Sequence, residues 1–346
     1  KRGRSRTKFV RNGSVSVGAS AREVIVKTSD GLSIALSTRG PSAFRVRFLH
    51  RVRRDRNPID SLMVQPRDAD APSEHVINRH GQGIKSHFGS IHVSPGGVLT
   101  LLTSNDTVIT KSRPILRTGA PDAVVLSSAN GRVYGGGSGP ADNTNLMKKG
   151  VTPGVKNRET YVPYYYATDG YSALGVANIT VGSGKPSYFP AVFSTSGQRI
   201  VWKFKGPFEL YLMPAHTLDL GTRCYYDLVG SPAVPPRHAF GFLASRWGWK
   251  DRSYIQKTLQ RFRSDRYPID SIIFDFEWYT PATDYHFGSS GRSWFQDFNY
   301  NDRVFPEPEK QFAQYKNKYN IRVGAIRKPR LGNTDNIRLA QSKGWI

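Results

Sequence analysis

Cysteine and long apolar runs are both scarce in this chain of 346 residues. The single cysteine, Cys224, excludes an internal disulfide framework and any cysteine-based metal site, so we expect it to be a small core residue. Apolar stretches such as that around 272–276 fall far short of a membrane span, and no apolar signal-peptide core follows the first residues. The length suffices for two ordinary domains, each with its own core.

Acidic residues are also scarce, with 26 Asp and Glu against 50 Lys and Arg, which gives a formal net charge of +24. Lysine and arginine crowd residues 1–11 without any acid, and a second cluster, "RVRRDR", lies at 51–56. Such tracts are typical of proteins that contact phosphate backbones, acidic glycans or an anionic surface, but they are equally typical of a solvated tail. Polyanion contact through 1–11 and 51–56 is therefore one prediction, although no recognisable nucleic-acid module accompanies these tracts.

Three N-x-S/T sequons, at Asn12, Asn105 and Asn178, would be glycan acceptors on a eukaryotic secretory route. Because such short motifs also arise by chance, they favour a secreted protein only weakly. Secretion, or residence in the secretory pathway, is the expected localisation.

Residues 14–230, which follow a basic tail at 1–13, alternate short β-branched and aromatic runs with Gly, Pro, Asn and Asp. This spacing predicts an antiparallel β-sandwich without a helix of normal length. The Asp-Gly pairs at 30–31 and 169–170 and the Asn-Gly pair at 130–131 predict tight hairpin turns.

Residues 231–346 have a different pattern, in which strands and helices alternate after a proline-rich connector. Helical spacing is expected over 251–268, with Asp251 or Ser253 as its cap, and a strand is expected at "IDSIIFDFEW", 269–278. A second helix, the strand "IRVGAI" at 321–326 and a third helix follow. The alternation predicts about three parallel βα units, an incomplete α/β (TIM-type) barrel. We expect the sequence to be a fragment, to be completed by another chain, or to be a decayed remnant held by partners.

Several motifs occur in an order that resembles glycoside hydrolase family 31, the α-glucosidases and α-xylosidases. They are the linker "YDLVGSPAVPP" at 226–236, the strand "GFLASRWGW" at 241–249, the strand "YPIDSIIFDFE" at 267–277 and the Phe-Pro pair at 305–306. The resemblance is strongest over 226–326 and looser upstream, for example at "SAFRVRF", 42–48.

The resemblance implies a retaining α-glycosidase, built as a β-sandwich followed by a (β/α)8 barrel, that acts on a carbohydrate substrate without a cofactor. In that family the nucleophile and the acid/base are aspartates on the fourth and sixth barrel strands, which would lie beyond Ile346. No residue here receives a catalytic role, no metal ligand is assigned, and the segment alone is predicted to be inactive. Two alternatives remain open: a non-catalytic, glycosidase-derived structural subunit that binds RNA or another polyanion, and a carbohydrate-binding sandwich without turnover.

The paired acids Asp275 and Glu277 are the first candidate site residues, because they would share one face at the end of the second strand. The resemblance implies that an acid here accepts hydrogen bonds from sugar hydroxyls, with Glu277 as first choice and Asp275 one layer deeper. The family usually has Asp where Glu277 stands. The alternative is a buried ion pair with Arg246 or Arg327.

Aromatic and basic residues at strand ends complete the candidate set. Two roles are equally expected for the aromatic residues here: stacking on sugar rings, or ordinary packing in the core. These residues are Trp247, Trp249, Trp278 and Tyr279. Arg327 and Lys328, after the third strand, would contact an anionic sugar or pair with Asp275 or Glu277.

Overall fold

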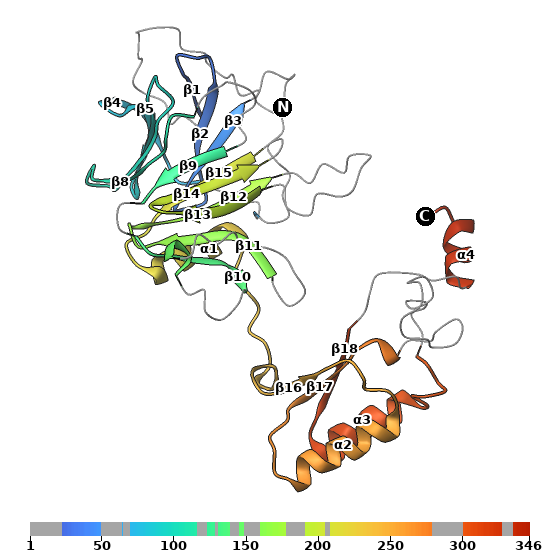
Figure 1. Ribbon diagram of the computed structural model, residues 1–346. Coiled ribbons are helices and arrows are strands. Elements are labelled where there is room, and N and C mark those ends of the chain that lie inside the picture. The colour runs from blue at the N-terminus through green and yellow to red at the C-terminus, as the bar shows by residue number, and fades with distance from the viewer. Residues whose placement is uncertain are drawn as a thin grey trace. The chain divides into compact units, whose positions relative to one another are not determined.

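The structure is a computed structural model that describes residues 23–49, 64, 70–115, 123–128, 131–138, 145–148, 160–177, 191–204, 208–278, 300–326 and 335–346. The chain divides into two compact units, Lys1–Pro232 and Ala233–Ile346 (Figure 1). The basic tracts at 1–11 and 51–56, the sequons at Asn12 and Asn178, and Tyr279, Arg327 and Lys328 lie outside the described residues.

The first unit is built mainly from antiparallel sheets. The largest has seven strands in the order β1 (Val24–Lys27), β2 (Ser33–Arg39), β3 (Ala43–Leu49), β15 (Phe208–Pro214), β12 (Tyr171–Ala177), β11 (Thr160–Ala167) and β10 (Val133–Ser138). A five-stranded sheet runs through β4 (Glu74–Asn78), β5 (Gly81–Ser86), β6 (Gly89–Val93), β7 (Leu99–Leu102) and β8 (Val108–Lys111). A three-stranded sheet has the order β13 (Ala191–Ser196), β14 (Arg199–Phe204) and β9 (Ala123–Ser127). A short 3-10 turn, η1, covers Leu146–Lys148.

All three sheets bury residues in one core. Ile34 of β2, Ile91 of β6 and Trp202 of β14 are completely buried in the same cluster, so the apolar faces of the sheets are turned toward one another. Strand alternation explains this arrangement, because every second residue of β14 is buried while its neighbours face outward. The Asp-Gly turns at 30–31 and 169–170 join β1 to β2 and β11 to β12 as predicted, with φ of 84° at Gly31 and 108° at Gly170.

The expectation that residues 14–230 hold no helix of normal length is wrong. Helix α1 (Leu218–Val229) begins after Thr217, whose hydroxyl accepts a hydrogen bond from the Leu220 N–H at 3.2 Å. Cys224 is buried on its inner face, which confirms the prediction that this residue belongs to the core. A Cβ atom at Gly221 would lie 2.9 Å from the Tyr166 ring, so glycine allows the helix to approach the sheet closely.

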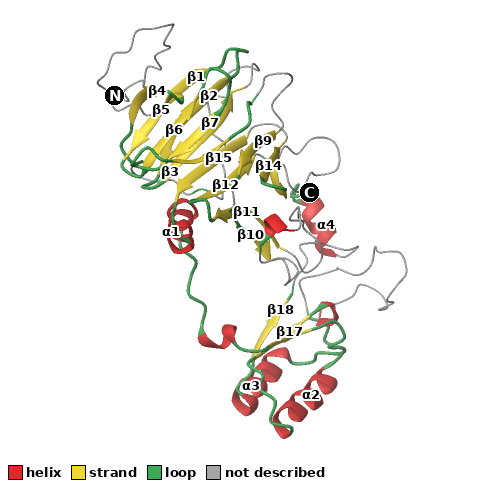
Figure 2. Cartoon of the chain, turned by 60° about the vertical axis from the view of Figure 1, so that its left-hand side comes forward, coloured by secondary structure: helices red, strands yellow, loops and turns green. Residues whose placement is uncertain are grey.

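The second unit contains a three-stranded parallel sheet, in the order β16 (Leu243–Ser245), β17 (Ser271–Phe274) and β18 (Arg322–Ala325). Helices α2 (Arg252–Ser264) and α3 (Pro308–Tyr319) lie side by side against one face of it (Figure 2). Ile272 and Phe274 of β17 pack there against Leu259 of α2 and Tyr315 of α3. Short 3-10 turns cover Arg237–Phe240 (η2) and Phe276–Trp278 (η3), and helix α4 covers Asp335–Ser342. None of the helices in the described ranges has the length and apolar character to cross a membrane.

Two acids hold fixed structural positions in the units. Asp251 caps α2, because its carboxylate accepts a hydrogen bond from the Tyr254 N–H at 2.7 Å. Glu209 on β15 is only 2% exposed and accepts hydrogen bonds from both Arg45 on β3 and the Tyr211 hydroxyl, the latter at 2.6 Å. This charge is therefore buried with two partners.

We predict that Arg45→Ala destabilises the first unit by about 3–5 kcal/mol, because it leaves the Glu209 carboxylate buried without its cation. Arg223→Ala removes an exposed i,i+4 ion pair with Asp219 and serves as the control, with an expected cost of about 0.5 kcal/mol or less. Chemical denaturation followed by tryptophan fluorescence measures both changes. Equal costs for the two variants would contradict a stabilising role for the buried pair.

Candidate carbohydrate site at the ends of the parallel strands

The carboxyl ends of β16, β17 and β18 lie next to one another, because the strands are parallel and paired in register. Ser245 pairs with Ile273, and Phe274 pairs with Ala325. The segments that leave these strands therefore start at one edge of the sheet, where parallel α/β folds bind ligands. They carry Arg246 to Trp249, Asp275 to Trp278, and Ile326.

The prediction that the second strand extends through Trp278 is wrong, since β17 ends at Phe274 and residues 276–278 form η3. Asp275 and Glu277 therefore do not share a strand face. The turn instead brings Glu277 toward the segment after β16, where its Oε1 atom accepts a hydrogen bond from the Gly248 N–H at 2.5 Å. This contact ties the end of the second strand to the end of the first.

The Glu277 side chain is buried, with 6% of the residue exposed. Burial is the main cause that raises the pKa of its carboxyl above the ordinary value of 4.5, and the nearby Asp275 charge adds to the rise. Backbone hydrogen bonds, including that from Gly248, and the Arg246 charge act in the opposite direction. The second oxygen, Oε2, is buried and has no hydrogen-bond partner within the described part of the chain.

The proposed ion pair between Glu277 and Arg246 is not formed. Arg246 donates from Nε to the Trp247 carbonyl at 3.0 Å and from Nη1 to the Tyr254 hydroxyl at 3.3 Å. Its guanidinium also lies over the Trp249 ring, 5.4 Å from the centroid. Arg246 therefore acts on Glu277 only through its charge at longer range. The other named partner, Arg327, lies outside the described residues.

The three described tryptophans at these strand ends differ in exposure. Trp249 and Trp278 are buried in the core of the second unit, at 3% and 8% exposed, whereas Trp247 is 50% exposed. The Trp278 indole Nε1 donates to the Ile326 carbonyl at 3.0 Å, which links the ends of the second and third strands. Burial favours core packing for Trp249 and Trp278, whereas Trp247 is the most exposed of these three described tryptophans.

Gly248 is a site residue that sequence reasoning missed. Its φ of 99° lies where a side chain is strained, and this conformation directs its N–H to Glu277. The signal was present in the sequence as a glycine between two tryptophans, "WGW", directly after a strand.

Comparison with known proteins finds related sequences. The family model described as "Glycosyl hydrolases family 31 TIM-barrel domain" matches residues 232–346. An α-xylosidase of Saccharolobus solfataricus is 23% identical over 226 residues, which are 62% of this chain and 28% of that protein. The lysosomal α-glucosidase of Rattus norvegicus is 27% identical over 140 residues, 39% of this chain and 14% of that protein.

Solved structures show the same fold. A GH31 α-xylosidase from a soil metagenome, crystallised with xylose, superposes with a TM-score of 0.73 at 16% identity and covers 96% of this chain and 50% of that chain. A GH31 dextranase of Flavobacterium johnsoniae, complexed with glucose, gives a TM-score of 0.71 at 14% identity, covering 95% and 40%. The chain thus spans half or less of the length of these relatives.

We predict that Glu277→Gln changes how stability depends on pH. Because burial raises the folded-state pKa, the folded protein binds this proton more tightly than the unfolded chain does. The resulting stabilisation is present below pH 4.5 and is lost as the pH rises through the folded-state pKa. Glutamine does not titrate, so the variant should gain stability relative to the wild type between pH 4 and pH 7, as measured by denaturant unfolding.

The matched control is Glu309→Gln at an exposed position on α3. We expect it to change the free energy of unfolding little at pH 4 or at pH 7. If Glu277→Gln and the wild type follow parallel stability curves over this range, the carboxyl does not titrate as a buried acid.

Proposed function

The chain belongs to glycoside hydrolase family 31, and on this basis we propose that it is part of a retaining α-glycosidase that removes terminal α-linked sugars. In this proposal the sheets of the first unit form a β-sandwich, and β16 to β18 are the first strands of a (β/α)8 barrel. The names of the relatives, α-xylosidase and α-glucosidase, favour α-xylosides or α-glucosides as substrates.

The single observation that carries the proposal is the Glu277 carboxylate. One oxygen is held by the Gly248 N–H, while Oε2 is buried and has no partner among the described residues. A buried carboxylate oxygen without a donor is costly, and a sugar hydroxyl that donates to it would remove that cost. Glu277 is therefore proposed to orient the sugar ring by accepting a hydroxyl hydrogen bond.

Neighbouring residues complete the proposed binding layer. Asp275 is half-buried and is separated from Glu277 by one residue. Its negative charge raises the pKa of the Glu277 carboxyl. Trp247 exposes half of its surface and is proposed to stack on the apolar face of a pyranose ring. Arg327 and Lys328 are proposed to contact an anionic sugar group or the paired acids.

Neither acid is assigned as nucleophile or acid/base. A retaining enzyme needs two carboxyl groups on different sides of the scissile bond, whereas Asp275 and Glu277 follow the same strand. By resemblance the two reacting carboxylates belong to the fourth and sixth barrel strands, beyond Ile346. We propose that those carboxylates perform the double displacement and that residues 1–346 alone do not turn over substrate.

A secretory route is a further part of the proposal. Asn105 of the "NDT" sequon lies exposed in the turn between β7 and β8, where an oligosaccharide would not disturb the core.

The activity is tested with the whole translated protein, assayed on aryl α-xylosides and α-glucosides. We expect hydrolysis with the α-anomer as first product by NMR, and no turnover by residues 1–346 alone. Glu277→Gln should lower kcat/KM about 10- to 100-fold, since hydrogen bonds to charged groups contribute about 1.5–3 kcal/mol.

Glu309→Gln again provides the control and should keep full activity. A β-anomeric first product would refute the retaining mechanism. If Glu277→Gln leaves kcat/KM unchanged, Glu277 does not bind the sugar, but the proposed glycosidase activity still stands.

A further inference from the structure

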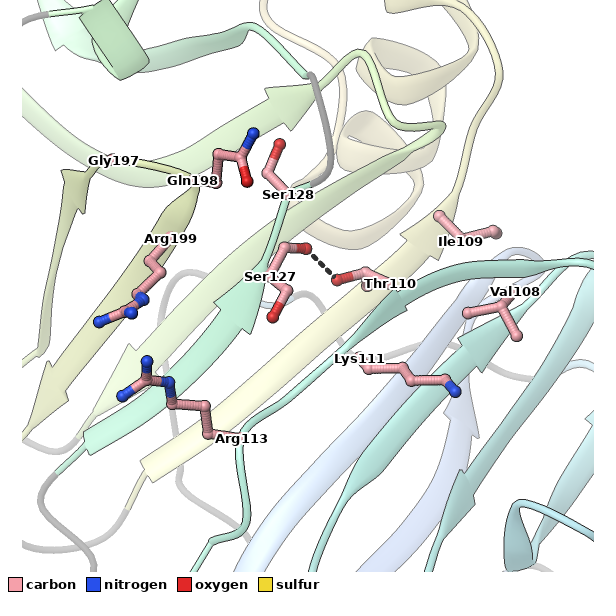
Figure 3. A pocket seen from close by; sticks show the side chains of 10 residues that line it. All are labelled: Val108, Ile109, Thr110, Lys111, Arg113, Ser127, Ser128, Gly197, Gln198 and Arg199. Atoms are coloured by element: carbon pink, nitrogen blue, oxygen red, sulfur yellow. Dashed lines mark hydrogen bonds between the residues drawn. The ribbon is translucent and has the colours of Figure 1, made fainter.

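A polar groove of about 820 Å³ lies in the first unit, where the end of β8 meets β9 and β14 (Figure 3). Three of its lining residues are the cations Lys111, Arg113 and Arg199. Apolar Val108 and Ile109 also line it, beside the hydroxyl residues Thr110, Ser127 and Ser128. The Thr110 hydroxyl donates to the Ser127 carbonyl at 2.7 Å. Every described residue that lines the groove belongs to this unit, and none of them is a residue of the candidate carbohydrate site.

Strand register explains why the three cations face the same side. Arg199 pairs with Ser127, and the bridge between Ser112 and Leu126 places Lys111 beside Ser127 on its other side. The Arg113 N–H donates to the Val125 carbonyl at 2.8 Å, which continues this pairing. Because Ser112 is buried, its neighbours Lys111 and Arg113 point to the outer face and are exposed.

The charges of the groove are not neutralised within the described part of the chain. Lys111, Arg113 and Arg199 form no ion pair there, whereas Arg45, Arg47 and Lys85 of the same unit each lie against a carboxylate. Asp169 accepts a hydrogen bond from Ser128 at the end of the groove. The Arg113 and Arg199 guanidinium groups extend toward the same region, so an anion placed between them gains favourable interactions with both, while Lys111 extends away from them and adds its charge at longer range (Figure 3).

We propose that this groove binds the sulfate or carboxylate group of an acidic saccharide chain. Arg113 and Arg199 extend their guanidinium groups on the same side of β9 (Figure 3), and guanidinium forks suit the oxyanions of both groups. The Ser127 hydroxyl and the Gln198 amide are donors and acceptors that match sugar hydroxyls.

A glycan fits the groove better than a single-stranded nucleic acid. None of the described residues that line the groove is aromatic, and base stacking on aromatic side chains is a main source of affinity for single strands. The site would attach the protein to an acidic polysaccharide independently of turnover at the parallel strand ends.

The experiment compares the chain with the triple variant Lys111→Gln/Arg113→Gln/Arg199→Gln. Binding is measured by titration calorimetry at low and physiological salt with four probes: heparin as a sulfated glycan, polygalacturonate as a carboxylated glycan, neutral dextran, and poly(U) RNA. We expect heparin or polygalacturonate to bind, dextran not to bind, and the triple variant to lose about tenfold in affinity, the combined effect of three exposed ion pairs.

A control variant, Lys257→Gln/Lys316→Gln/Lys343→Gln, removes the same number of exposed charges from the second unit and should keep the wild-type affinity. Circular dichroism establishes that both variants are folded. Stronger binding of heparin or of polygalacturonate identifies the anionic group. Equal losses in the two variants, failure of both acidic glycans to bind, or poly(U) binding that equals glycan binding and is lost in the triple variant would each overturn the assignment.

Discussion

Parallel pairing of β17 with both of its neighbours is the constraint on which the candidate carbohydrate site depends. The register brings the ends of three strands to one edge, and two hydrogen bonds then join the segments that follow them. Gly248 donates to Glu277 across the first pair, and Trp278 donates to Ile326 across the second. The strand register and the backbone conformation of Gly248 therefore fix the position of the Glu277 carboxylate.

Three groups of charges in this protein differ in how they are compensated. The Glu209 charge is buried and satisfied by Arg45 and Tyr211, which is expected of a structural group. Among the described residues, Glu277 is buried with a hydrogen-bond donor at only one of its two oxygens, and the groove cations are exposed and form no ion pair. Incomplete compensation in a folded protein points to a ligand that completes it. The two sites differ in the ligand group they would take, because Glu277 would accept a hydrogen bond from a neutral hydroxyl whereas the groove cations would bind an anion.

Local pattern was sufficient to predict much of the fold. The Asp-Gly turns, the cap at Asp251 and the alternation of strands and helices after Pro232 follow from short-range rules. Helix α1 was missed because Gly221, Tyr225 and Tyr226 are poor helix formers, and its stability comes from packing on the sheet. Helix propensity alone therefore did not predict α1.

The candidate site was only partly predictable. The residue types and their place at a strand end identified Glu277, but the apolar run around it suggested a strand where the backbone turns into η3. The contact with Gly248 joins residues 29 positions apart, and the groove joins three strands, so neither follows from local sequence.

The most direct test of the central claim is a crystal structure of the whole translated protein with bound xylose or glucose. The account predicts a sugar hydroxyl about 2.7 Å from Glu277 Oε2. A structure in which a protein donor occupies Oε2 and the sugar binds elsewhere would contradict it.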